Sequence, residues 1–297
     1  MLHKDLVSLW NLNRDDVSEL FKYASQLKSN RINLSLKGKI LALVFEKPSL
    51  RTRVTFETAI YELGGYAIYL SPGDIGLGSR ESIKDVALNL SRWVSVIVAR
   101  TFAHETVVEL ARYATIPVIN GLSDLEHPCQ ALADLFTIYE KKGNLSKIKL
   151  AYVGDGNNVC HSLMLGASIC GITMEVATPP GYEPKKEYVE KTGINVVNDP
   201  HEAVRDADII YTDVWTSMGQ EAEYEKRMRD FRKFQVNETL LNHAKRDVHV
   251  MHCLPAHRGE EITDDVIDGP HSVVFDQAEN RLHVQKAILI KLLGHKL

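Results

Sequence analysis

The sequence predicts an α/β protein of two domains, each built on a mostly parallel β-sheet flanked by helices. Short apolar runs rich in β-branched residues alternate with helical patterns along most of the chain, as they do in βαβ units with right-handed crossovers. Several runs are apolar almost throughout, which is typical of strands covered on both faces. The length of 297 residues also exceeds that of one ordinary domain.

The first half begins this alternation at residues 40–45, which read ILALVF and predict a buried strand. A helical pattern follows, and the order of strand and helix repeats as far as residue 140. The predicted strands of this half are residues 40–45, 66–70, 95–99 and 117–120, and its predicted helices lie at about 52–63, 83–92 and 130–140.

The second half resumes with another apolar run and a Gly-rich turn before its first helix. Its later runs keep the β-branched composition that favours strands. The predicted strands are residues 149–153, 173–177, 209–212, 248–252 and 272–275, and the predicted helices lie at about 162–170 and 277–293.

The domain boundary is expected in residues 141–148, KKGNLSKI, a polar and turn-forming stretch where the pattern pauses. We assign residues 1–140 to the first domain and 141–279 to the second. No strand follows the last helix, which is therefore able to return to either domain; we place residues from about 280 to 297 with the first. The active site is expected in a cleft between the domains.

Composition limits the function. Hydrophobic content of 44% and charged content of 25% are ordinary for a soluble globular protein. The formal net charge of −4 argues against a general nucleic-acid-binding protein, which is usually basic. No apolar stretch reaches the roughly 20 residues that a membrane span needs, and the N-terminus shows neither a signal nor a transit pattern. The four cysteines have no Cys-x-x-Cys spacing, so we expect a cytoplasmic protein with reduced thiols.

Anion-binding side chains gather where the first-half strands end. The first strand leads into Ser49, Arg51 and Thr52, and a helix that begins at Thr52 or Arg53 would add backbone N–H groups. A guanidinium and two hydroxyls at a helix N-terminus predict a phosphate site. The alternative is that Ser49 and Thr52 only cap the helix while the arginines are solvated.

Further donors follow the later strands of the first half. Arg100 ends the third predicted strand, although a solvated arginine is the plainer interpretation of that position. His127 and Gln130 are three apart at a helix start, so both can face one ligand and donate to a carbonyl oxygen. A capping role for this segment is the alternative.

Acids, amides and a thiol follow the strands of the second half. The turn GDGNN at 154–158 lacks Gly-x-Gly-x-x-Gly, which argues against a dinucleotide site, and Asn157 and Asn158 suit the amino and carboxylate groups of a small ligand. Asp213 and Ser217 stand in DVWTSMG, and Cys253 follows the next strand in HCLPAHRG. An inert buried thiol is the commoner fate of a cysteine. Arg281 begins the last helix, where a solvated charge is the alternative.

These motifs resemble the aspartate/ornithine transcarbamoylase family over essentially the whole chain. Four motifs occur in the order of the family, which makes the resemblance specific. They are Ser49-x-Arg51-Thr52-Arg53, His127-Pro128-x-Gln130, Asp213-x-x-x-Ser217-Met218-Gly219 and His252-Cys253-Leu254-Pro255.

The resemblance implies a binding role for each motif, with no metal and no cofactor. Arg100, His127, Asp213 and Cys253 would be the catalytic residues, and the Cys253 thiol and the Leu254 carbonyl would also meet the attacking amine. The implied carbamoyl-phosphate-binding residues are Ser49, Leu50, Arg51, Thr52, Arg100, His127, Gln130, Cys253, Leu254 and Arg281. The implied L-ornithine-binding residues are Asn158, Asp213, Ser217 and Met218.

The Ser-Met-Gly turn and the thiol favour L-ornithine, with citrulline and phosphate as products, over aspartate, putrescine or N-acetylornithine. The sequence leaves the direction of the reaction open. A nucleotide-dependent dehydrogenase lacks its glycine fingerprint here, and a non-catalytic binding module has no use for a thiol and an acid. The resemblance also implies a homotrimer or a multiple of trimers.

Two positions depart from the family pattern. Leu50 stands where many relatives have Thr, so only its backbone N–H can serve a phosphate. In the family the loop at 71–82 delivers a polar side chain to the phosphate of a neighbouring subunit, and the matching residue here is Gly76. Ser79 or Arg80 is a hypothetical substitute.

Overall fold

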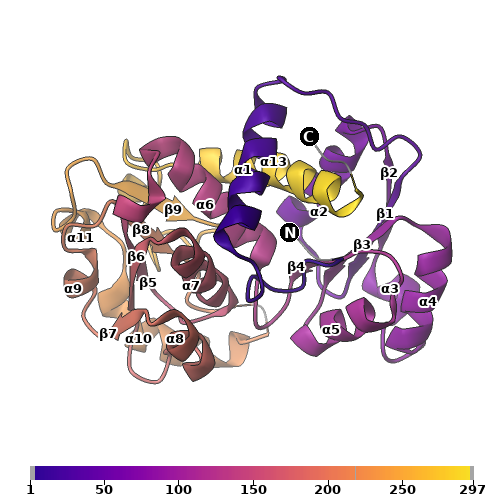
Figure 1. Cartoon of the computed structure of the whole chain (residues 1–297). Coiled ribbons are helices and arrows are strands. Elements are labelled where there is room, and N and C mark those ends of the chain that lie inside the picture. Colours follow the sequence, from indigo (N-terminus) through magenta and orange to yellow (C-terminus); the bar gives the residue numbers. More distant parts are fainter. Residues whose placement is uncertain (1–3, 218, 295–297) are drawn as a thin grey trace. The chain divides into compact units, whose positions relative to one another are not determined.

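The computed structural model describes residues 4–217 and 219–294. The chain forms two compact units (Figure 1): the first comprises residues up to Ala133 and from Glu279, and the second comprises Asp134–Ala278. The division falls within two helices, α6 (Pro128–Lys142) and α13 (Val274–Leu292), and it precedes the polar stretch 141–148.

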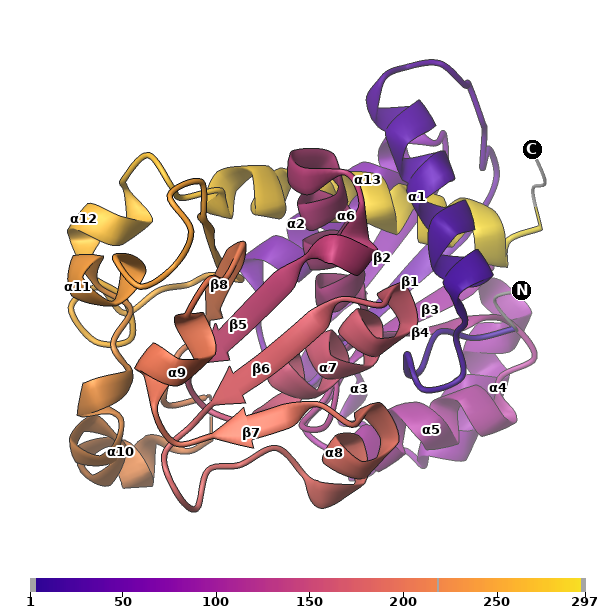
Figure 2. The ribbon, with the colours of Figure 1, turned by 60° about the vertical axis from the view of Figure 1, so that its left-hand side comes forward.

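The first unit is built on a 4-stranded parallel sheet with the order β2-β1-β3-β4. Side chains from α4 and α5 join those of β1 and β3 in one buried apolar cluster, so these helices cover one face. Figures 1 and 2 show α1, α2 and α13 on the other side of the strands. The strands are β1 (Ile40–Phe45), β2 (Tyr66–Leu70), β3 (Val96–Arg100) and β4 (Val118–Leu122); the other helices are α1 (Arg14–Lys28), α2 (Leu50–Glu62), α3 (Pro72–Ile75), α4 (Ile83–Trp93) and α5 (His104–Tyr113).

The second unit is built on a 5-stranded parallel sheet with the order β7-β6-β5-β8-β9. Figure 2 shows β5, β6 and β7 side by side, with α7 packed close to them. The strands are β5 (Lys149–Val153), β6 (Thr173–Ala177), β7 (Asn195–Val197), β8 (Ile209–Thr212) and β9 (His249–His252). The helices are α7 (Asn158–Cys170), α8 (Lys186–Thr192), α9 (Pro200–Val204), α10 (Tyr224–Asp230), α11 (Glu238–Leu241) and α12 (Asp264–Ile267), with 3₁₀ turns at Leu145–Lys147, Glu221–Glu223 and Arg232–Phe234.

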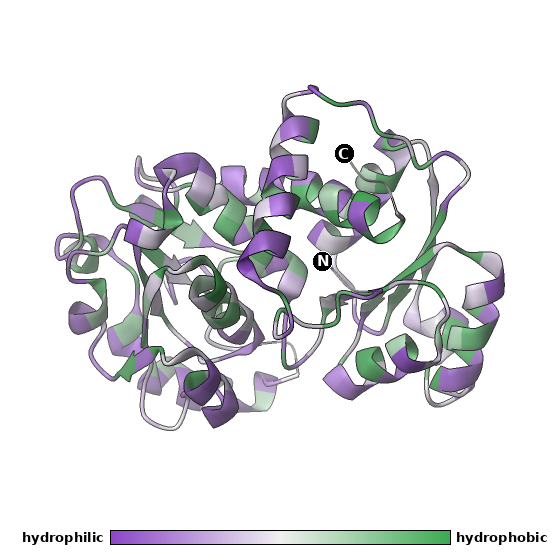
Figure 3. Ribbon diagram, in the orientation of Figure 1, coloured by the Kyte–Doolittle hydropathy of each residue, from purple (hydrophilic) through white to green (hydrophobic). Residues whose placement is uncertain are grey.

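Burial explains why the central strands have apolar sequences. Every residue of β3 and of β8 is buried, so neither face of these strands needs polar side chains. Figure 3 shows the strands as largely hydrophobic, with hydrophilic residues on the helices and loops. The predicted class, two α/β domains that each have a mostly parallel sheet flanked by helices, is confirmed by both sheets. None of the described helices has the length and apolar character needed to cross a membrane.

The predicted strand at 272–275 is wrong. Only Ser272 forms an isolated bridge, with Val250, and the chain then turns into α13 at Val274. Val274 packs into the apolar core from the first turn of that helix. A short apolar run fits a buried helix start as well as a strand, and here the helix prevails. The other predicted strands are present; most have the predicted ends, and the ends of β3, β4 and β9 are shifted by one or two residues.

Helix α1 was not predicted, although its start carries a clear local signal. Asn13 accepts from the N–H groups of Asp15 and Asp16, and the Asp16 carboxylate accepts from the Asn13 N–H. This reciprocal pair is a capping box, a recognisable mark of a helix N-terminus.

Candidate functional site

Both sheets reverse their strand order at a point where candidate residues gather. In the first unit the reversal lies between β1 and β3, and in the second between β5 and β8. Ligands of open α/β sheets bind beyond the carboxyl ends of the strands at such points. Each unit therefore offers one site, at the ends of these strands.

Ser49 is the N-cap of α2, and its Oγ accepts from the Thr52 N–H at 3.2 Å. The helix begins at Leu50, so the expected start at Thr52 or Arg53 is wrong. The reason is that an extended Ser at the cap position satisfies the third N–H of the helix and lets the helix begin immediately after it. Ser49 thus has the capping role that was the alternative interpretation, and its hydroxyl proton still permits it to donate.

Arg281 connects two of the predicted anion-binding residues in the first unit. Its Nη1 donates to Gln130 Oε1 at 2.8 Å, and its Nη2 donates to Thr52 Oγ1 at 2.8 Å. All three side chains are buried. The structure therefore gathers the first turn of α2, the start of α6 and α13 around one guanidinium, and a solvated role for Arg281 is wrong.

His127 lies buried among positive charges, which determine its protonation. Burial is the first cause that holds the pKa of its imidazole well below the ordinary 6.5, and four cations add to the effect. These cations are Arg281, Arg100, Lys47 and Arg51. His127 is therefore neutral at physiological pH and can donate a hydrogen bond from one ring nitrogen only.

Lys47 is a member of this cationic cluster that sequence analysis missed. Burial, followed by the charge of Arg100, lowers the pKa of Lys47 to about 8. Its Nζ lies 5.0 Å from the ring centroid of Phe102. Lys47 precedes the Ser49 motif by two residues, so its position in the sequence was the available signal.

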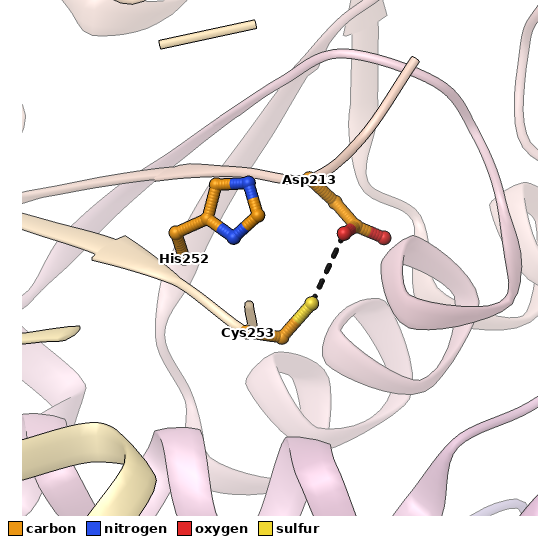
Figure 4. Close-up of side chains that lie close together, drawn as sticks. All are labelled: Asp213, His252 and Cys253. Atoms are coloured by element: carbon orange, nitrogen blue, oxygen red, sulfur yellow. Dashed lines mark hydrogen bonds between the residues drawn. The ribbon is translucent and has the colours of Figure 1, made fainter. Parts of the chain in front are cut away.

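The site of the second unit centres on Asp213, which directly follows β8 (Figure 4). Its Oδ1 accepts from Cys253 Sγ at 3.0 Å, and its Oδ2 accepts from Asn157 Nδ2 at 2.8 Å. Thr212 pairs with His252 in the sheet, which brings the residues after β8 and β9 side by side. Cys253 is half-buried and bonded to a carboxylate, unlike an inert core thiol.

His252 supports the same turn but is not available as a metal ligand. Its Nδ1 accepts from the Leu254 N–H at 2.8 Å, so the proton is on Nε2, which lies 3.0 Å from Glu261 Oε1. Candidate ligand atoms of Asp213, His252 and Cys253 lie within 4.8 Å of one another. Because both ring nitrogens of His252 are engaged, a metal ion there would first have to break the bond to Leu254.

Leu254 has a backbone conformation that needs such support. Its φ is +58°, in the left-handed region that a leucine rarely adopts. The bond from its N–H to His252 holds this conformation, and Glu261 in turn accepts from the His257 N–H at 2.6 Å. The direction of the Leu254 carbonyl is therefore fixed by two buried side chains.

The remaining predicted residues of the second unit lie near this centre in the chain. Asn158 is the first residue of α7, directly after the Asn157 that contacts Asp213. The Ser217 N–H donates to Gln220 Oε1 at 3.0 Å. Met218 lies outside the described residues. Asn157 stands in the same GDGNN turn, and the sequence analysis gave it no role separate from that of Asn158.

A buried ion pair ties together the two loops of this site. Arg227 Nη1 lies 3.1 Å from Asp155 Oδ2 and donates to the Trp215 carbonyl at 2.8 Å. Burial raises the pKa of Asp155 to about 6 in spite of the arginine. Neither residue was predicted. A Cβ on Gly156 would lie 2.3 Å from Pro184 N, so this glycine allows close backbone packing and is not evidence for a dinucleotide site.

Comparison with known proteins identifies the family. Residues 4–140 match the carbamoyl-P binding domain of aspartate/ornithine carbamoyltransferase, and residues 146–292 match the Asp/Orn binding domain. The chain belongs to the aspartate/ornithine carbamoyltransferase family. Both halves of the sequence are accounted for by this match.

Relatives within the carbamoyltransferase family are similar over nearly the whole chain. The ornithine carbamoyltransferase of Archaeoglobus fulgidus is 55% identical over 300 residues, covering 98% of each chain. The anabolic ornithine carbamoyltransferase of Pyrococcus furiosus is 52% identical over 304 residues, covering 98% of this chain and 96% of the relative. The crystal structure of ornithine carbamoyltransferase from Thermus thermophilus has a TM-score of 0.93 at 50% identity, with 99% of this chain and 100% of that chain covered.

The carbamoyltransferase motifs occupy corresponding places in the two sheets. The Ser49 motif follows β1, the His127 motif opens α6, the Asp213 motif follows β8 and the Cys253 motif follows β9. Each motif thus lies at or beyond the carboxyl end of a strand or at the start of a helix. This common placement explains why motif residues so distant in the sequence gather at the strand ends of each unit.

Proposed function

We propose that this protein is an ornithine carbamoyltransferase. It transfers the carbamoyl group of carbamoyl phosphate to the side-chain amine of L-ornithine and releases L-citrulline and phosphate. The observation that carries the proposal is the buried donor cluster around the N-terminus of α2, where Arg281 joins Thr52 and Gln130. Relatives that bear this name at up to 55% identity support the choice of acceptor.

The first unit binds carbamoyl phosphate. Ser49, the N–H of Leu50, Arg51, Thr52 and Arg100 hold the phosphate, since a helix N-terminus and guanidinium groups favour an anion. Arg281 occupies Gln130 Oε1, so the donor end of this amide is Nε2. Gln130 and the neutral His127 then donate to the carbonyl oxygen.

The second unit binds L-ornithine. Asn158, Asp213, Ser217 and Met218 hold its α-amino and α-carboxylate groups. The Cys253 thiol and the Leu254 carbonyl contact its side-chain amine and the carbamoyl group. An alkyl amine has a pKa near 10, so the amine loses a proton before it attacks.

The reaction proceeds by attack of the neutral amine on the carbamoyl carbon. The tetrahedral intermediate carries negative charge on the former carbonyl oxygen, which His127 and Gln130 stabilise by about 3 kcal/mol per donor. The C–O bond to phosphate then breaks. Arg51, Arg100 and the N-terminus of α2 stabilise the leaving phosphate.

The test is citrulline formation from carbamoyl phosphate with four acceptors in parallel: L-ornithine, L-aspartate, putrescine and N-acetylornithine. The proposal expects product with L-ornithine alone. Product from another amine would keep the phosphate site and reject the acceptor. We assign the direction toward citrulline, because one of the relatives above is named anabolic.

We further propose a homotrimer in the cytoplasm. Large apolar side chains are exposed on α2 and on the edge strand β2 of the first unit, including Leu50, Tyr61 and Tyr66 at 73%, 77% and 66%. Large apolar side chains that lie exposed in one subunit are expected to be covered where subunits meet. Light scattering after size-exclusion chromatography tests the trimer, and a monomer would reject it. The hypothesis on the 71–82 loop is rejected if the joint change Ser79→Ala and Arg80→Ala leaves the KM for carbamoyl phosphate unaltered.

A further inference from the structure

Asn157 contacts the centre of the second unit through both ends of its amide. Its Oδ1 accepts from the backbone N–H of Val159 at 3.0 Å and of Cys160 at 3.1 Å, so it caps α7. Its Nδ2 donates to Asp213 Oδ2 at 2.8 Å. Two backbone donors can only point at an oxygen, which fixes the orientation of the amide and places the N–H₂ group against Asp213.

A third contact stiffens this arrangement. The hydroxyl of Tyr152, a fully buried residue of β5, donates to the Asp155 carbonyl at 2.9 Å and lies 3.3 Å from Asn157 Oδ1. The amide oxygen therefore has two backbone donors and lies beside the Tyr152 hydroxyl, whose single proton goes mainly to the nearer Asp155 carbonyl. Its nitrogen has little freedom to move away from the carboxylate.

The rigid Asn157 amide restrains the orientation of the Asp213 carboxylate. One oxygen of its carboxylate accepts from Asn157 and the other from Cys253 Sγ. The pair of bonds fixes the rotation of the carboxylate about its last bond. Asp213 is 5% exposed, so water does not replace a lost donor readily.

We propose that Asn157 is a positioning residue that keeps the Asp213 carboxylate turned toward Cys253 and the bound L-ornithine. The proposal rests on the proposed function and adds a role that the sequence analysis did not assign. Asn157 acts through Asp213, whereas its neighbour Asn158 is assigned to the substrate.

The test compares Asn157→Asp with the wild-type protein. Aspartate is also a good N-cap, so this change keeps the cap of α7 and replaces the N–H₂ donor by an oxygen 2.8 Å from Asp213 Oδ2. We expect kcat/KM for L-ornithine at pH 7.5 to fall by about 10- to 100-fold, the effect of losing one hydrogen bond to a charged group. The KM for carbamoyl phosphate should change little.

The pH dependence separates positioning from a merely structural role. Two carboxylates in contact share a proton as the pH falls, and that proton restores a donor to Asp213. The activity of Asn157→Asp relative to wild type should therefore rise between pH 8 and pH 6. Asp155 is the other charged group near Asp213, and it is coupled to Arg227 and Glu223. These groups are present in both proteins, so their effects cancel when the activity of the variant is divided by that of wild type.

Asn237→Asp is the matched control. Asn237 caps α11 through Oδ1, but its Nδ2 lies 3.4 Å from the neutral Gln235 Oε1 and contacts no carboxylate in the described residues. It should leave kcat/KM and its pH dependence unaltered. Asn157→Asp with wild-type kinetics at every pH, in a protein that forms citrulline, would overturn the proposal.

A second measurement does not depend on turnover. The pKa of the Cys253 thiol, read from the pH dependence of its alkylation by iodoacetamide, should rise in Asn157→Asp, because a new negative charge joins the Asp213 carboxylate that the thiol contacts. Cys129, Cys160 and Cys170 are buried and react slowly. An unaltered thiol pKa would reject the geometry itself, whereas a shift in a protein without citrulline formation would reject only the proposed function.

Discussion

Arg281 donates to Gln130 Oε1 at 2.8 Å, and this bond fixes the orientation of the Gln130 amide, so that its Nε2 is the end turned toward a substrate. The same guanidinium donates to Thr52. An arginine near the C-terminus thus orders two groups in the first half of the chain. Its planar fork suits this task, because a lysine cannot make two parallel bonds of fixed direction.

Arg281→Lys should therefore raise the KM for carbamoyl phosphate by about 10- to 100-fold, the effect of losing a charge-assisted bond inside a buried network. The charge is kept, so the result reports geometry and not net charge. Initial rates at saturating L-ornithine measure it. Arg258→Lys is the control, because Arg258 is exposed and pairs with Asp264 and Asp268 on the surface of the second unit. Equal KM values for the two variants would contradict the role given to Arg281.

His127 should act as a neutral donor at every physiological pH. The pKa of His127 lies well below 6.5 because the side chain is buried among cations. A lowered histidine pKa means that the imidazole stays neutral as the pH falls through 6.5. The pH profile of kcat should therefore have no limb, that is no titration step, from a histidine between pH 6 and pH 8. His127→Ala should lower kcat by about 100- to 1,000-fold, and His127→Asn, which keeps a donor, should recover part of that loss.

The matched control for His127 is His283→Ala. The pKa of His283 is also lowered by burial, but its partner is Glu279 on the same helix. Its removal should leave kcat unaltered. A histidine limb near pH 6.5 that disappears in His127→Asn would show that the imidazole titrates, against the prediction.

The buried carboxyl of Asp155 should make the free energy of unfolding fall as the pH rises from 4 to 6. Its pKa is about 6 in the folded protein and 3.8 when exposed, so the folded state binds the proton more tightly. The stability that comes from this proton is present below pH 4 and is lost as the pH rises to 6. Two pKa units correspond to about 3 kcal/mol. As the pH rises from 4 to 7, the stability of wild type relative to that of Asp155→Asn should therefore fall by up to this amount.

Urea unfolding of both proteins at pH 4, 5, 6 and 7 measures this difference. Asp268→Asn is the control, because Asp268 is an exposed partner of Arg258 and the pKa of its carboxyl is lowered. Its difference from wild type should stay nearly constant from pH 4 to pH 7, because a carboxyl whose pKa is lowered from 3.8 takes up its proton only below this range. A flat difference for Asp155→Asn would mean that its carboxyl is ionised throughout this range.

The local features of the fold were readable from the sequence, and the long-range contacts were not. The strand at 40–45 and the Ser49 cap depend on neighbouring residues, so composition and spacing suffice to place them. The bond from Arg281 to Thr52 joins residues 229 positions apart. Only the strand order decides that these two meet, and a family motif was needed to include Arg281 at all.

The neighbouring asparagines 157 and 158 show a second limit. Both suit a polar ligand, and no pattern in the sequence separates their roles. The start of α7 separates them: the N-cap residue turns its amide back to the helix and to Asp213, whereas Asn158 begins the helix itself. A one-residue difference in a helix start is below the accuracy of pattern analysis.

Lys47 should give the pH profile of carbamoyl phosphate binding an alkaline limb, a range in which the KM rises with pH. A lysine with a pKa of about 8 is charged below that pH and neutral above it, so the positive charge facing the phosphate is lost as the pH rises. The KM for carbamoyl phosphate should therefore increase above pH 8 in the wild-type protein. Lys47→Met should have a KM about 10-fold higher at pH 7, as expected for one lost charge in a partly buried site, and should lack the limb. The control is Lys84→Met, whose Nζ lies 5.6 Å from the Tyr113 ring but outside the cluster. If Lys47→Met keeps the wild-type limb, another group titrates there, and Lys47 is a packing residue over Phe102.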